Sequence, residues 1–300
     1  MMKLGIIPNT EKENIIEVVE LLVNKLDSKK VTHFINDSFI ESAKRSETLQ
    51  KCHFISNEEL FSESDIIVSI GGDGTVLTTG YLARNSGTPI LGINYGKLGF
   101  LAEYEIKNLD KLIDELLNDD YYIEERITLT GSTSQGEEDK YFAINDIVID
   151  KGKWPKMIEL ELKVDDKYVS TFLADGIIIS TPTGSTGYSL STGGPIVAPE
   201  AKAITISPIS PHTLTMRPLV LSSNQKISIK TTSQHESIQI SCDGQRVSQD
   251  KSPSFVHISN SNIPLKLVRT KSTSYFNILR KKLFWGIDIR SNLNNGGASD

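Results

Sequence analysis

The chain has 300 residues, 38% of them apolar and 23% charged, and a formal net charge of −6. This composition is typical of a soluble globular protein and excludes a largely disordered or membrane-embedded chain. The length favours two domains. The acidic balance argues against a nucleic-acid partner, because nucleic acids select a basic face. An anionic ligand would have to be bound by local backbone donors, a metal ion or a few well-placed cations.

Neither the N-terminal segment nor the cysteines indicate a special compartment. The first apolar run ends at Pro8 and is too short for the core of a signal peptide, and no stretch reaches the length of a membrane span. Cys52 and Cys242 stand far apart without the spacing of metal ligands. We therefore expect a cytoplasmic protein with reduced cysteines and no membrane partner.

The first 120 residues alternate between short apolar runs and helical periods. The runs KLGIIP, VTHFI, CHFI, DIIVSI and PILGIN are typical of buried strands. Two helical periods place their apolar side chains on one face: Ile15, Val18, Val19, Leu22 and Leu26 in the first, and Leu109, Leu112, Ile113 and Leu116 in the second. This alternation predicts an α/β domain over residues 1–120, with a mostly parallel sheet covered by helices.

From residue 121 the pattern changes to that of a β-rich protein. Apolar residues alternate strictly in the run MIELELKV, and hairpin signals recur at GSTSQGEEDK and SSNQ. Helical periods are absent until past residue 270. We predict a β-rich domain over residues 121–270, a helical segment over residues 271–290 that packs back on the first domain, and a disordered polar tail over residues 291–300.

The run IIVSIGGDGTVLTTGYLA, residues 66–83, joins a buried-type strand to a helical period through a glycine-rich loop. At the carboxyl end of a parallel strand, backbone N–H groups and a helix N-terminus bind anions, and glycines allow a ligand to approach the main chain. Gly71, Gly72, Gly74 and Thr75 are therefore candidates for a phosphate-binding loop. The loop lacks the lysine of a P-loop and the spacing of a dinucleotide fingerprint, so neither standard motif accounts for it.

The same loop holds one carboxylate, Asp73, which is unfavourable beside a phosphate unless a proton or a cation lies between them. Asp73 therefore indicates either activation of a hydroxyl group or binding of Mg²⁺, and both point to phosphoryl transfer onto an alcohol. The alternative is structural, namely a tight turn in which Asp73 caps the following helix.

A second cluster, residues 174–197, leads from an apolar run into glycines interleaved with serines and threonines. Such a loop offers neutral hydrogen-bonding groups to a sugar or phosphate, and Tyr188 offers a flat face for a base. The alternative is an ordinary polar turn, and Asp175 has the alternative role of a turn former. Asn145 and Asp146 interrupt a strand-like apolar run, so they either bind ligand hydroxyls or mark a strand end or bulge.

Seven motifs, in this order, resemble those of the NAD kinase family: GGDGT, GINYGKLGFL, INDIVI, DGIIISTPTGSTGYSLSTGGPIV, PHTLTMRPLVL, ISCDGQ and SYFNILRKKL. Phosphofructokinases and diacylglycerol or sphingosine kinases carry loops related to GGDGT, whereas the Thr-Gly-Ser stretch with its following GGP is far more specific to NAD kinases. The resemblance spans roughly residues 66–285. It implies a Rossmann-like first domain with a parallel sheet, a β-sandwich-like second domain that binds NAD, and a site between the two.

The resemblance further implies an ATP-dependent transfer of the γ-phosphoryl group to the 2′-hydroxyl of the adenosine ribose of NAD, giving NADP. NAD and ATP are then the small-molecule partners, and some members accept polyphosphate as donor. Mg²⁺ would accompany the ATP, without a tightly bound organic cofactor, and the sequence assigns no metal ligand. Many members of the family assemble as homotetramers or homodimers.

Carried over residue by residue, the resemblance implies that Asp73 is the general base or the orienting carboxylate for the ribose hydroxyl, with Gly74 beside it. Asn145 and Asp146 stand at the family's Asn-Glu pair, which holds ribose hydroxyls. Asp175 falls where the nicotinamide carboxamide is bound.

The resemblance also implies an adenine-binding loop in which Tyr188 stacks on the base and Ser191 bonds its edge. The whole loop comprises Thr186, Gly187, Tyr188, Ser189, Leu190 and Ser191. Gln245 matches a polar position that faces the substrate.

The sequence departs from the family pattern at several of these positions. Asp146 is one methylene shorter than the usual Glu, which reduces its reach, and Gly187 stands where alanine is usual. Leu173 replaces an arginine of many members, so one expected cation near the ligand is missing. Tyr95 replaces an arginine or threonine often seen after GIN. Lys156 stands where members often have histidine or arginine. It is either a cation that binds the ligand or a lysine exposed to solvent.

Two other functions compete with this interpretation. One is another kinase with the same glycine–aspartate loop, acting on a lipid or a sugar phosphate. No basic amphipathic stretch suggests a membrane-docking surface, and Arg217 and Arg246 do not cluster with the loop in sequence. The other is a non-catalytic NAD(P)-binding regulator. Retention of Asp73 argues against it, because a pure binding protein gains nothing from a carboxylate beside phosphates.

Overall fold

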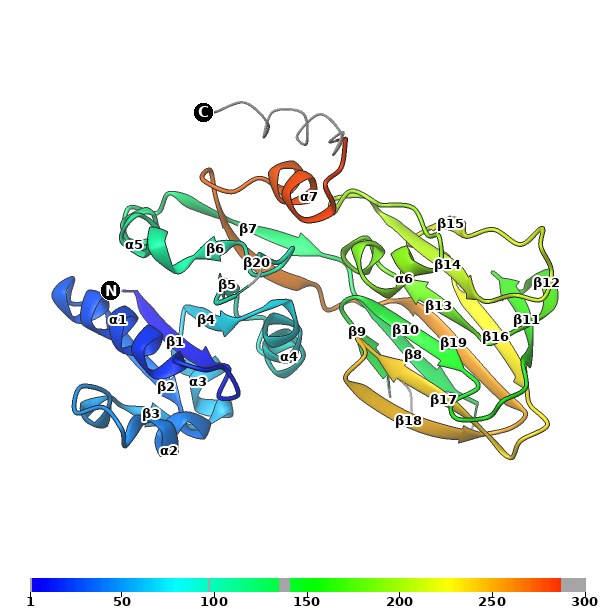
Figure 1. Ribbon diagram of the computed structural model, residues 1–300, viewed down its shortest axis with the longest axis horizontal. Coiled ribbons are helices and arrows are strands. Elements are labelled where there is room, and N and C mark those ends of the chain that lie inside the picture. The colour runs from blue at the N-terminus through cyan, green and yellow to red at the C-terminus, as the bar shows by residue number, and fades with distance from the viewer. Residues whose placement is uncertain (1, 97, 135–140, 287–300) are drawn as a thin grey trace, which may run out of the picture. The chain divides into compact units, whose positions relative to one another are not determined.

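The computed structural model describes residues 2–96, 98–134 and 141–286. The chain divides into two compact units (Figure 1): unit 1 comprises residues 1–79, 88–124 and 267–300, and unit 2 comprises residues 80–87 and 125–266. Unit 1 is therefore discontinuous in sequence, since the chain returns to it after completing unit 2. The disordered tail expected over residues 291–300 lies outside the described residues.

Unit 1 is built on an eight-stranded sheet with the order β3-β2-β1-β4-β5-β20-β7, and β6 also pairs with β5. The strands are β1 (Lys3–Pro8), β2 (Thr32–Asn36), β3 (Phe54–Ile55), β4 (Ile66–Gly71), β5 (Ile90–Asn94), β6 (Tyr104–Glu105), β7 (Tyr121–Arg126) and β20 (Leu265–Thr270). The strands from β3 to β20 run parallel to their neighbours in this order. The five apolar runs each form a strand, which confirms the predicted parallel sheet.

The strand order places β1 and β4 side by side, with β2 on one flank and β5 on the other. The chain thus leaves β1 and β4 in opposite directions across the sheet. In open α/β sheets, ligands bind at this kind of switch point, outside the carboxyl ends of the two strands.

The helices of unit 1 follow the predicted apolar faces. They are α1 (Ile15–Ser28), α2 (Ile40–Ala43), α3 (Asn57–Glu63), the first residues of α4 (Asp73–Ala83), α5 (Leu109–Leu117) and α7 (Tyr275–Leu283). All four apolar residues predicted for the face of α5 are buried. On α1, four of the five predicted apolar residues are buried. The fifth, Val18, is only half-buried against the same core, and Val23, which was not predicted, is buried.

Unit 2 consists of two six-stranded sheets with the orders β15-β14-β13-β10-β17-β18 and β12-β11-β16-β19-β8-β9. The first contains β10 (Asp146–Asp150), β13 (Gly176–Ser180), β14 (Ala203–Ile209), β15 (Leu219–Ser222), β17 (Ser237–Cys242) and β18 (Arg246–Lys251). The second contains β8 (Leu129–Thr133), β9 (Tyr141–Ala143), β11 (Ile158–Val164), β12 (Lys167–Ala174), β16 (Ile227–Thr232) and β19 (Ser254–Asn260). Their pairings are antiparallel.

One hydrophobic core is shared by the two sheets of unit 2, which confirms the predicted sandwich-like arrangement. Ile147 and Ile177 come from one sheet, and Leu160 and Ile229 from the other. The strict alternation predicted for the run MIELELKV also holds, because every apolar residue from Ile158 to Val164 in that alternation is buried.

Two sequence expectations for unit 2 were wrong. The SSNQ stretch is not a hairpin turn, because it joins β15 and β16, which belong to different sheets. The region expected to lack helix contains a 3₁₀ turn, Thr183–Thr186, and the short helix α6 (Tyr188–Ser191). A single turn of this length has no apolar period from which it could be recognised. The other hairpin signal, GSTSQGEEDK, lies between β8 and β9, which pair antiparallel as in a hairpin. Residues 135–140 of this stretch lie outside the described part of the chain.

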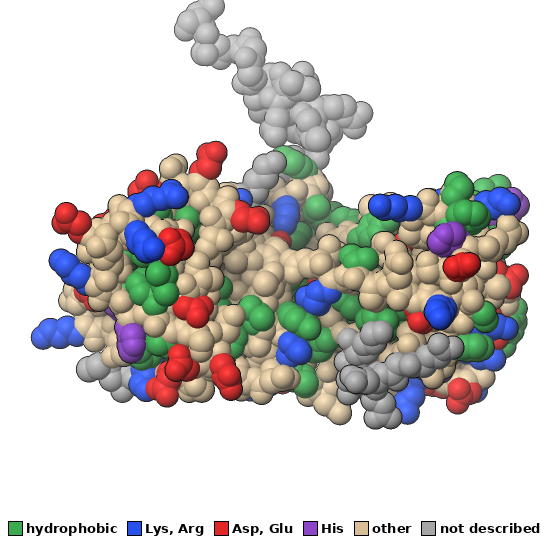
Figure 2. All heavy atoms as spheres, turned by 90° about the horizontal axis from the view of Figure 1, so that it is seen from below, with side chains coloured by type: hydrophobic (Ala, Val, Ile, Leu, Met, Phe, Trp, Pro, Cys, Tyr) green, Lys and Arg blue, Asp and Glu red, His purple; other side chains and the backbone are tan. Residues whose placement is uncertain are grey.

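The surface and the cysteines show no unusual feature in the part of the chain that is described. Lys and Arg side chains are interspersed with Asp and Glu on the face drawn in Figure 2. None of the described helices combines the length and the apolarity needed to span a bilayer. Cys52 and Cys242 are free thiols, and burial, with the charge of Asp243, raises the pKa of Cys242 to about 12.

A buried ion-pair cluster ties the returning strand β20 to the rest of unit 1. Arg269 lies 3.0 Å from Glu103 and 2.9 Å from Glu124, and the side chains of Arg269 and Glu103 are each only 3% exposed. We expect Arg269→Met to lower the free energy of unfolding of unit 1 by about 3–5 kcal/mol, because it leaves buried carboxylates without this cation.

Urea titration followed by circular dichroism measures this effect. The control is Lys271→Met, since Lys271 pairs with Asp120 at 3.8 Å on the surface with 89% of its side chain exposed. This control should change the stability by less than about 1 kcal/mol. Equal losses in the two variants would contradict the assignment of the stabilisation to the buried cluster.

Candidate active site

The glycine-rich loop lies at the carboxyl end of β4, where it meets the loop that follows β1. Gly71 ends β4, and Asp73 begins α4. The side-chain amide of Asn9, directly after β1, donates to Thr75 Oγ1 at 3.1 Å, and the backbone N–H of Gly72 donates to the same oxygen at 3.3 Å. Thr75 thus connects both loops at the switch point of the sheet.

Two glycines of this loop have different roles. A Cβ at Gly71 would collide with the side chain of Thr75, so only glycine allows Thr75 to fold back under the loop. A Cβ at Gly72 would meet nothing within 4 Å. The space beside Gly72 is therefore open to a ligand.

The carboxylate of Asp73 accepts hydrogen bonds from three consecutive backbone N–H groups of the loop after β5. Phe100 donates to Oδ2 at 2.9 Å, and Leu101 and Ala102 donate to Oδ1 at 2.9 and 3.1 Å. A Cβ at Gly99 would overlap Asp73 Oδ1, so the approach requires glycine there. We call this arrangement of one carboxylate and three consecutive N–H groups an amide clamp. Helix capping alone, the structural alternative for Asp73, does not account for it.

The C-terminal helix supplies a cation to the same carboxylate. The ammonium of Lys282 on α7 lies 3.1 Å from Asp73 Oδ2 and 4.7 Å from the centre of the Phe100 ring. Burial raises the pKa of Asp73, but the charge of Lys282 and the three N–H groups outweigh it, so the net pKa lies below its usual value. Asp73 is therefore ionised at neutral pH.

Unit 2 contains a second amide clamp, centred on Asp243. Its carboxylate accepts from the backbone N–H groups of Ile144 and Asn145 at 2.9 and 2.6 Å, and from that of Asp146 at a longer 3.4 Å. Arg246 supplies the cation, 2.6 Å from Asp243 Oδ2. The side chain of Asp243 is fully buried, so this clamp fixes the backbone that carries Asn145 and Asp146.

The cation of this second clamp, Arg246, packs against the aromatic ring of Tyr81. The guanidinium of Arg246 lies 3.9 Å from the centre of the Tyr81 ring, and that of Arg84 lies 4.0 Å from the same centre. Arg246 also donates to the carbonyl of Phe142 at 3.0 Å. Its orientation is therefore fixed by three different contacts.

Asn145 directly precedes β10 and Asp146 begins it, as the structural alternative predicted. Within the described residues, the buried Oδ1 of Asn145 has no hydrogen-bond partner. Burial, and then the charge of Asp243, raise the pKa of Asp146 to about 7. A Cβ at Gly187 would lie 3.9 Å from Asn145 Nδ2 and 4.0 Å from Asp146 Oδ2. The fold thus brings these three predicted residues together.

Two family models match this chain. The model of the ATP-NAD kinase N-terminal domain matches residues 4–121, and that of the ATP-NAD kinase C-terminal domain matches residues 144–270. The NAD kinase of Flavobacterium johnsoniae is 36% identical over 296 residues, covering 97% of this chain and 100% of that protein.

The chain belongs to the NAD kinase family.

Further comparisons agree with this assignment. The NAD kinase of Caldanaerobacter subterraneus subsp. tengcongensis is 37% identical over 285 residues, which cover 94% of this chain and 99% of that protein. The crystal structure of an NAD kinase from Archaeoglobus fulgidus in complex with ATP has a TM-score of 0.75 and 26% identity, covering 94% of this chain and 99% of that one. The predicted family, and its class as a phosphotransferase, are confirmed.

A structure with lower sequence identity shares the fold. Yeast NADH kinase complexed with NADH has a TM-score of 0.87 and 24% identity, covering 96% of this chain and 89% of that one. At this identity the likeness shows the fold alone.

The predicted adenine loop of this family member, residues 186–191, comprises the last residue of the 3₁₀ turn, Gly187 and α6. Tyr188 is 49% exposed, so its ring is accessible. Ser189 is buried, with its hydroxyl 2.9 Å from that of Ser207. The hydroxyls of Thr186 and Ser191 donate to backbone carbonyls of their own turns, and Leu190 is half-buried.

Asp175 lies away from the Asn145–Asp146 pair. Asp175 pairs with Lys151 at 2.6 Å and precedes Gly176, which is opposite Asp150. Since Asp146 is opposite Ser180, Asp175 lies at the other end of the β10–β13 pair.

Three predicted side chains are exposed to solvent. Lys156 donates to Gln234 at 3.0 Å, and Leu173 is 45% exposed on β12. Gln245 is exposed in the turn that follows Asp243.

Sequence reasoning had not singled out Asp243, Arg246, Lys282 or the loop over residues 100–102 as parts of the site. Asp243 nevertheless lies inside the motif ISCDGQ, Lys282 inside SYFNILRKKL, and residues 100 and 101 inside GINYGKLGFL, all of which carried the family resemblance. Arg246 and Ala102 directly follow the first and the last of these motifs. One signal was available: Asp243-Gly244 repeats the Asp73-Gly74 pair of the glycine-rich loop.

The raised pKa of Asp146 predicts a pH dependence of stability. Between about pH 4 and pH 7 the unfolded chain has lost this proton while the folded chain still holds it. The free energy of unfolding of unit 2 should therefore fall as the pH rises through this range. Asp146→Asn cannot titrate and should lose less stability over the same range.

Urea unfolding of both proteins at several pH values measures the difference. Asp166→Asn, in the exposed turn between β11 and β12, is the control and should keep the wild-type slope. If wild type and Asp146→Asn gave parallel stability–pH curves, Asp146 would not carry a raised pKa in the folded protein.

Proposed function

We propose that this member of the NAD kinase family transfers the γ-phosphoryl group of ATP to the 2′-hydroxyl of the adenosine ribose of NAD, giving NADP and ADP. The hydroxyl oxygen forms a new bond to the γ-phosphorus, the bond from that phosphorus to the β,γ-bridging oxygen breaks, and the hydroxyl proton is released. The observation that carries the proposal is the ionised carboxylate of Asp73, held beside an open glycine loop at the switch point of a parallel sheet. The Archaeoglobus relative, whose structure contains ATP, supports ATP as the donor.

We assign Asp73 the orienting role rather than that of a strong general base. A carboxylate with a lowered pKa accepts a proton poorly, but it accepts a hydrogen bond from a hydroxyl group well. Phosphoryl transfer depends mainly on aligning the reactants and stabilising charge, and a fixed carboxylate contributes to alignment. The amide clamp supplies that fixation.

We assign the ribose to Asn145 and Asp146, and the adenine to the face of Tyr188. The buried Oδ1 of Asn145 lacks a partner among the described residues, and ribose hydroxyls would satisfy it. Asp146 is a hydrogen-bond donor or acceptor at neutral pH, because its pKa of about 7 leaves both forms populated. Gly187 lies beside both side chains and adds no side chain of its own there.

Mg²⁺ is proposed to arrive on the phosphates of ATP rather than on a preformed protein site. In the described part of the chain no group of three or more His, Cys, Asp or Glu side chains is arranged to hold a metal ion. Both oxygens of Asp73 are occupied by N–H groups and Lys282. These residues do not form a magnesium site by themselves.

We also propose that the protein is a homodimer or homotetramer. Two edge strands of unit 2 carry exposed apolar side chains: Tyr168, Val169 and Leu173 on β12, and Leu219 and Val220 on β15. Exposed apolar edge strands are typical of interfaces between copies. Light scattering should give two or four times the chain mass of 33.2 kDa, and a monomer would contradict the proposal.

The direct test of the activity is purified protein with Mg-ATP and NAD, with NADP detected by a coupled dehydrogenase. We expect turnover that EDTA abolishes, and Asp73→Asn should lower kcat by at least about 10²-fold with the fold intact, because the acceptor hydroxyl loses its alignment. Asp114→Asn, an exposed carboxylate on α5, is the control and should keep wild-type turnover. NAD binding without any NADP would instead favour a regulator, and near-normal kcat in Asp73→Asn would remove the role of Asp73.

Tyr188→Ala should weaken NAD binding by about 1–3 kcal/mol if the ring stacks on the adenine, by analogy with base–aromatic stacking. Tyr188→Phe keeps the ring and should bind NAD like the wild type. Calorimetric titration with NAD distinguishes the variants. Equal affinities of wild type and Tyr188→Ala would exclude the stacking.

A further inference from the structure

Asp73 has four hydrogen-bond partners, and only one of them is able to move without the main chain. The N–H groups of Phe100, Leu101 and Ala102 belong to a backbone that packs against Gly92, where a Cβ would lie 2.7 Å from the Leu101 carbonyl. The fourth partner, Lys282, is a flexible side chain from α7 with 36% of its surface exposed. An ionised carboxyl has about four acceptor positions, so in this state none is left for a substrate hydroxyl.

The surroundings of Lys282 suit a phosphate. The space beside Gly72, the residue directly before Asp73, is open. The ring of Phe100 would keep the ammonium near this position after it leaves Asp73, because its face attracts cations. The terminal phosphate of ATP carries more negative charge than a carboxylate and would compete for the ammonium.

We propose that Lys282 binds the terminal phosphate of the donor and, by leaving Asp73 Oδ2, frees that oxygen to accept a hydrogen bond from the acceptor hydroxyl. This inference rests on the proposed function, since it takes ATP to be the ligand of the glycine-rich loop. It assigns the C-terminal helix a direct part in donor binding. Donor binding would thereby make Asp73 Oδ2 available to accept a hydrogen bond from the acceptor hydroxyl.

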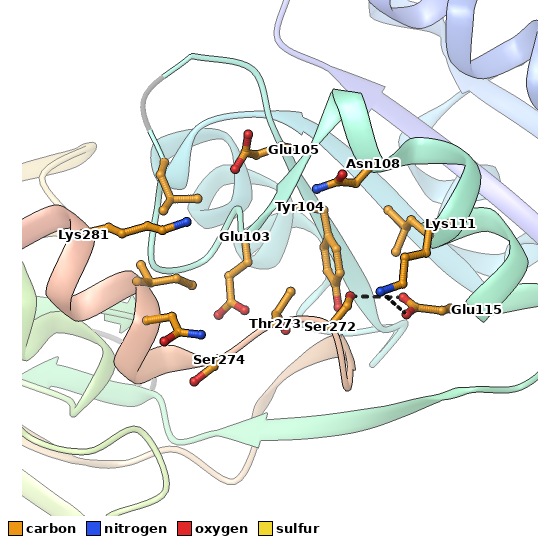
Figure 3. A pocket seen from close by; sticks show the side chains of 14 residues that line it. Glu103, Tyr104, Glu105, Asn108, Lys111, Glu115, Ser272, Thr273, Ser274 and Lys281 are labelled. Carbon is orange, nitrogen blue, oxygen red and sulfur yellow. Dashed lines mark hydrogen bonds and ion pairs between the residues drawn. The ribbon is translucent and has the colours of Figure 1, made fainter.

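The neighbouring Lys281 offers a matched control. It has the same chemistry and lies one residue earlier on α7, but it extends into a separate pocket lined also by Glu103, Tyr104 and Glu105 (Figure 3). A loss of positive charge from α7 is therefore common to Lys281→Gln and Lys282→Gln, whereas the contact with Asp73 is lost only in the second variant.

The experiment compares wild type, Lys282→Gln, Lys282→Arg and Lys281→Gln by calorimetric titration with Mg-ATP in the absence of NAD, and then by steady-state kinetics. Loss of one charge-assisted hydrogen bond should weaken ATP binding about 10- to 100-fold in Lys282→Gln. Lys282→Arg should recover most of the affinity, and Lys281→Gln should stay near the wild type. Affinity for NAD alone should not fall in any variant, because Lys282→Gln removes the ammonium that occupies Asp73 Oδ2.

Two results would overturn the inference. One is an unchanged ATP affinity in Lys282→Gln. The other is an equal weakening of ATP and NAD binding together with a lower melting temperature, which would indicate a structural role only. The ATP titration requires no turnover, so it tests the role of Lys282 even if the wild type makes no NADP. The absence of NADP formation would refute the proposed function and not the role of Lys282.

Discussion

The candidate residues of each unit depend on one interaction, a carboxylate that accepts three consecutive backbone N–H groups and is balanced by one cation. Asp73 holds the loop after β5 and is paired with Lys282, and Asp243 holds the start of β10 and is paired with Arg246. Consecutive N–H groups converge on one point only when the loop is sharply bent, so each clamp fixes both a charge and a backbone shape.

The two clamps differ in exposure, and this difference suggests different uses. Asp243 is fully buried, and its cation is stacked on Tyr81 and hydrogen-bonded to a carbonyl, so the clamp acts as a rigid support for the neighbouring polar side chains. Asp73 retains 27% exposure and its cation 36%, so this clamp remains accessible to ligands. The negative charge in a phosphate-type loop is thus explained by contacts with residues that follow much later in the chain.

How far the sequence predicted the structure depended on the range of the interaction. The faces of α1 and α5 and the alternation in β11 are local periodicities, and they identified strands, helices and core correctly. The glycine-rich loop was singled out because it holds glycines and a carboxylate between a strand-like run and a helical period. The Asn145–Asp146 pair was singled out because two polar residues interrupt an apolar run. The partners of Asp73 were not predicted, because Lys282 stands 209 residues away and no local pattern encodes such a contact. The same holds for the backbone N–H groups that donate to Asp243, because they lie 97 to 99 residues earlier in the chain.

The discontinuity of unit 1 also affects how the protein is made. During synthesis the first 124 residues leave the ribosome with the glycine-rich loop in place, but β20, Arg269 and Lys282 follow only after all of unit 2. Early domains generally fold as they emerge, yet this sheet must wait for a strand that inserts between β5 and β7. The nascent chain therefore acquires the cation that pairs with Asp73 last. A ribosome that stops before residue 265 releases a chain without β20, the cation of Asp73 or the buried ion-pair cluster.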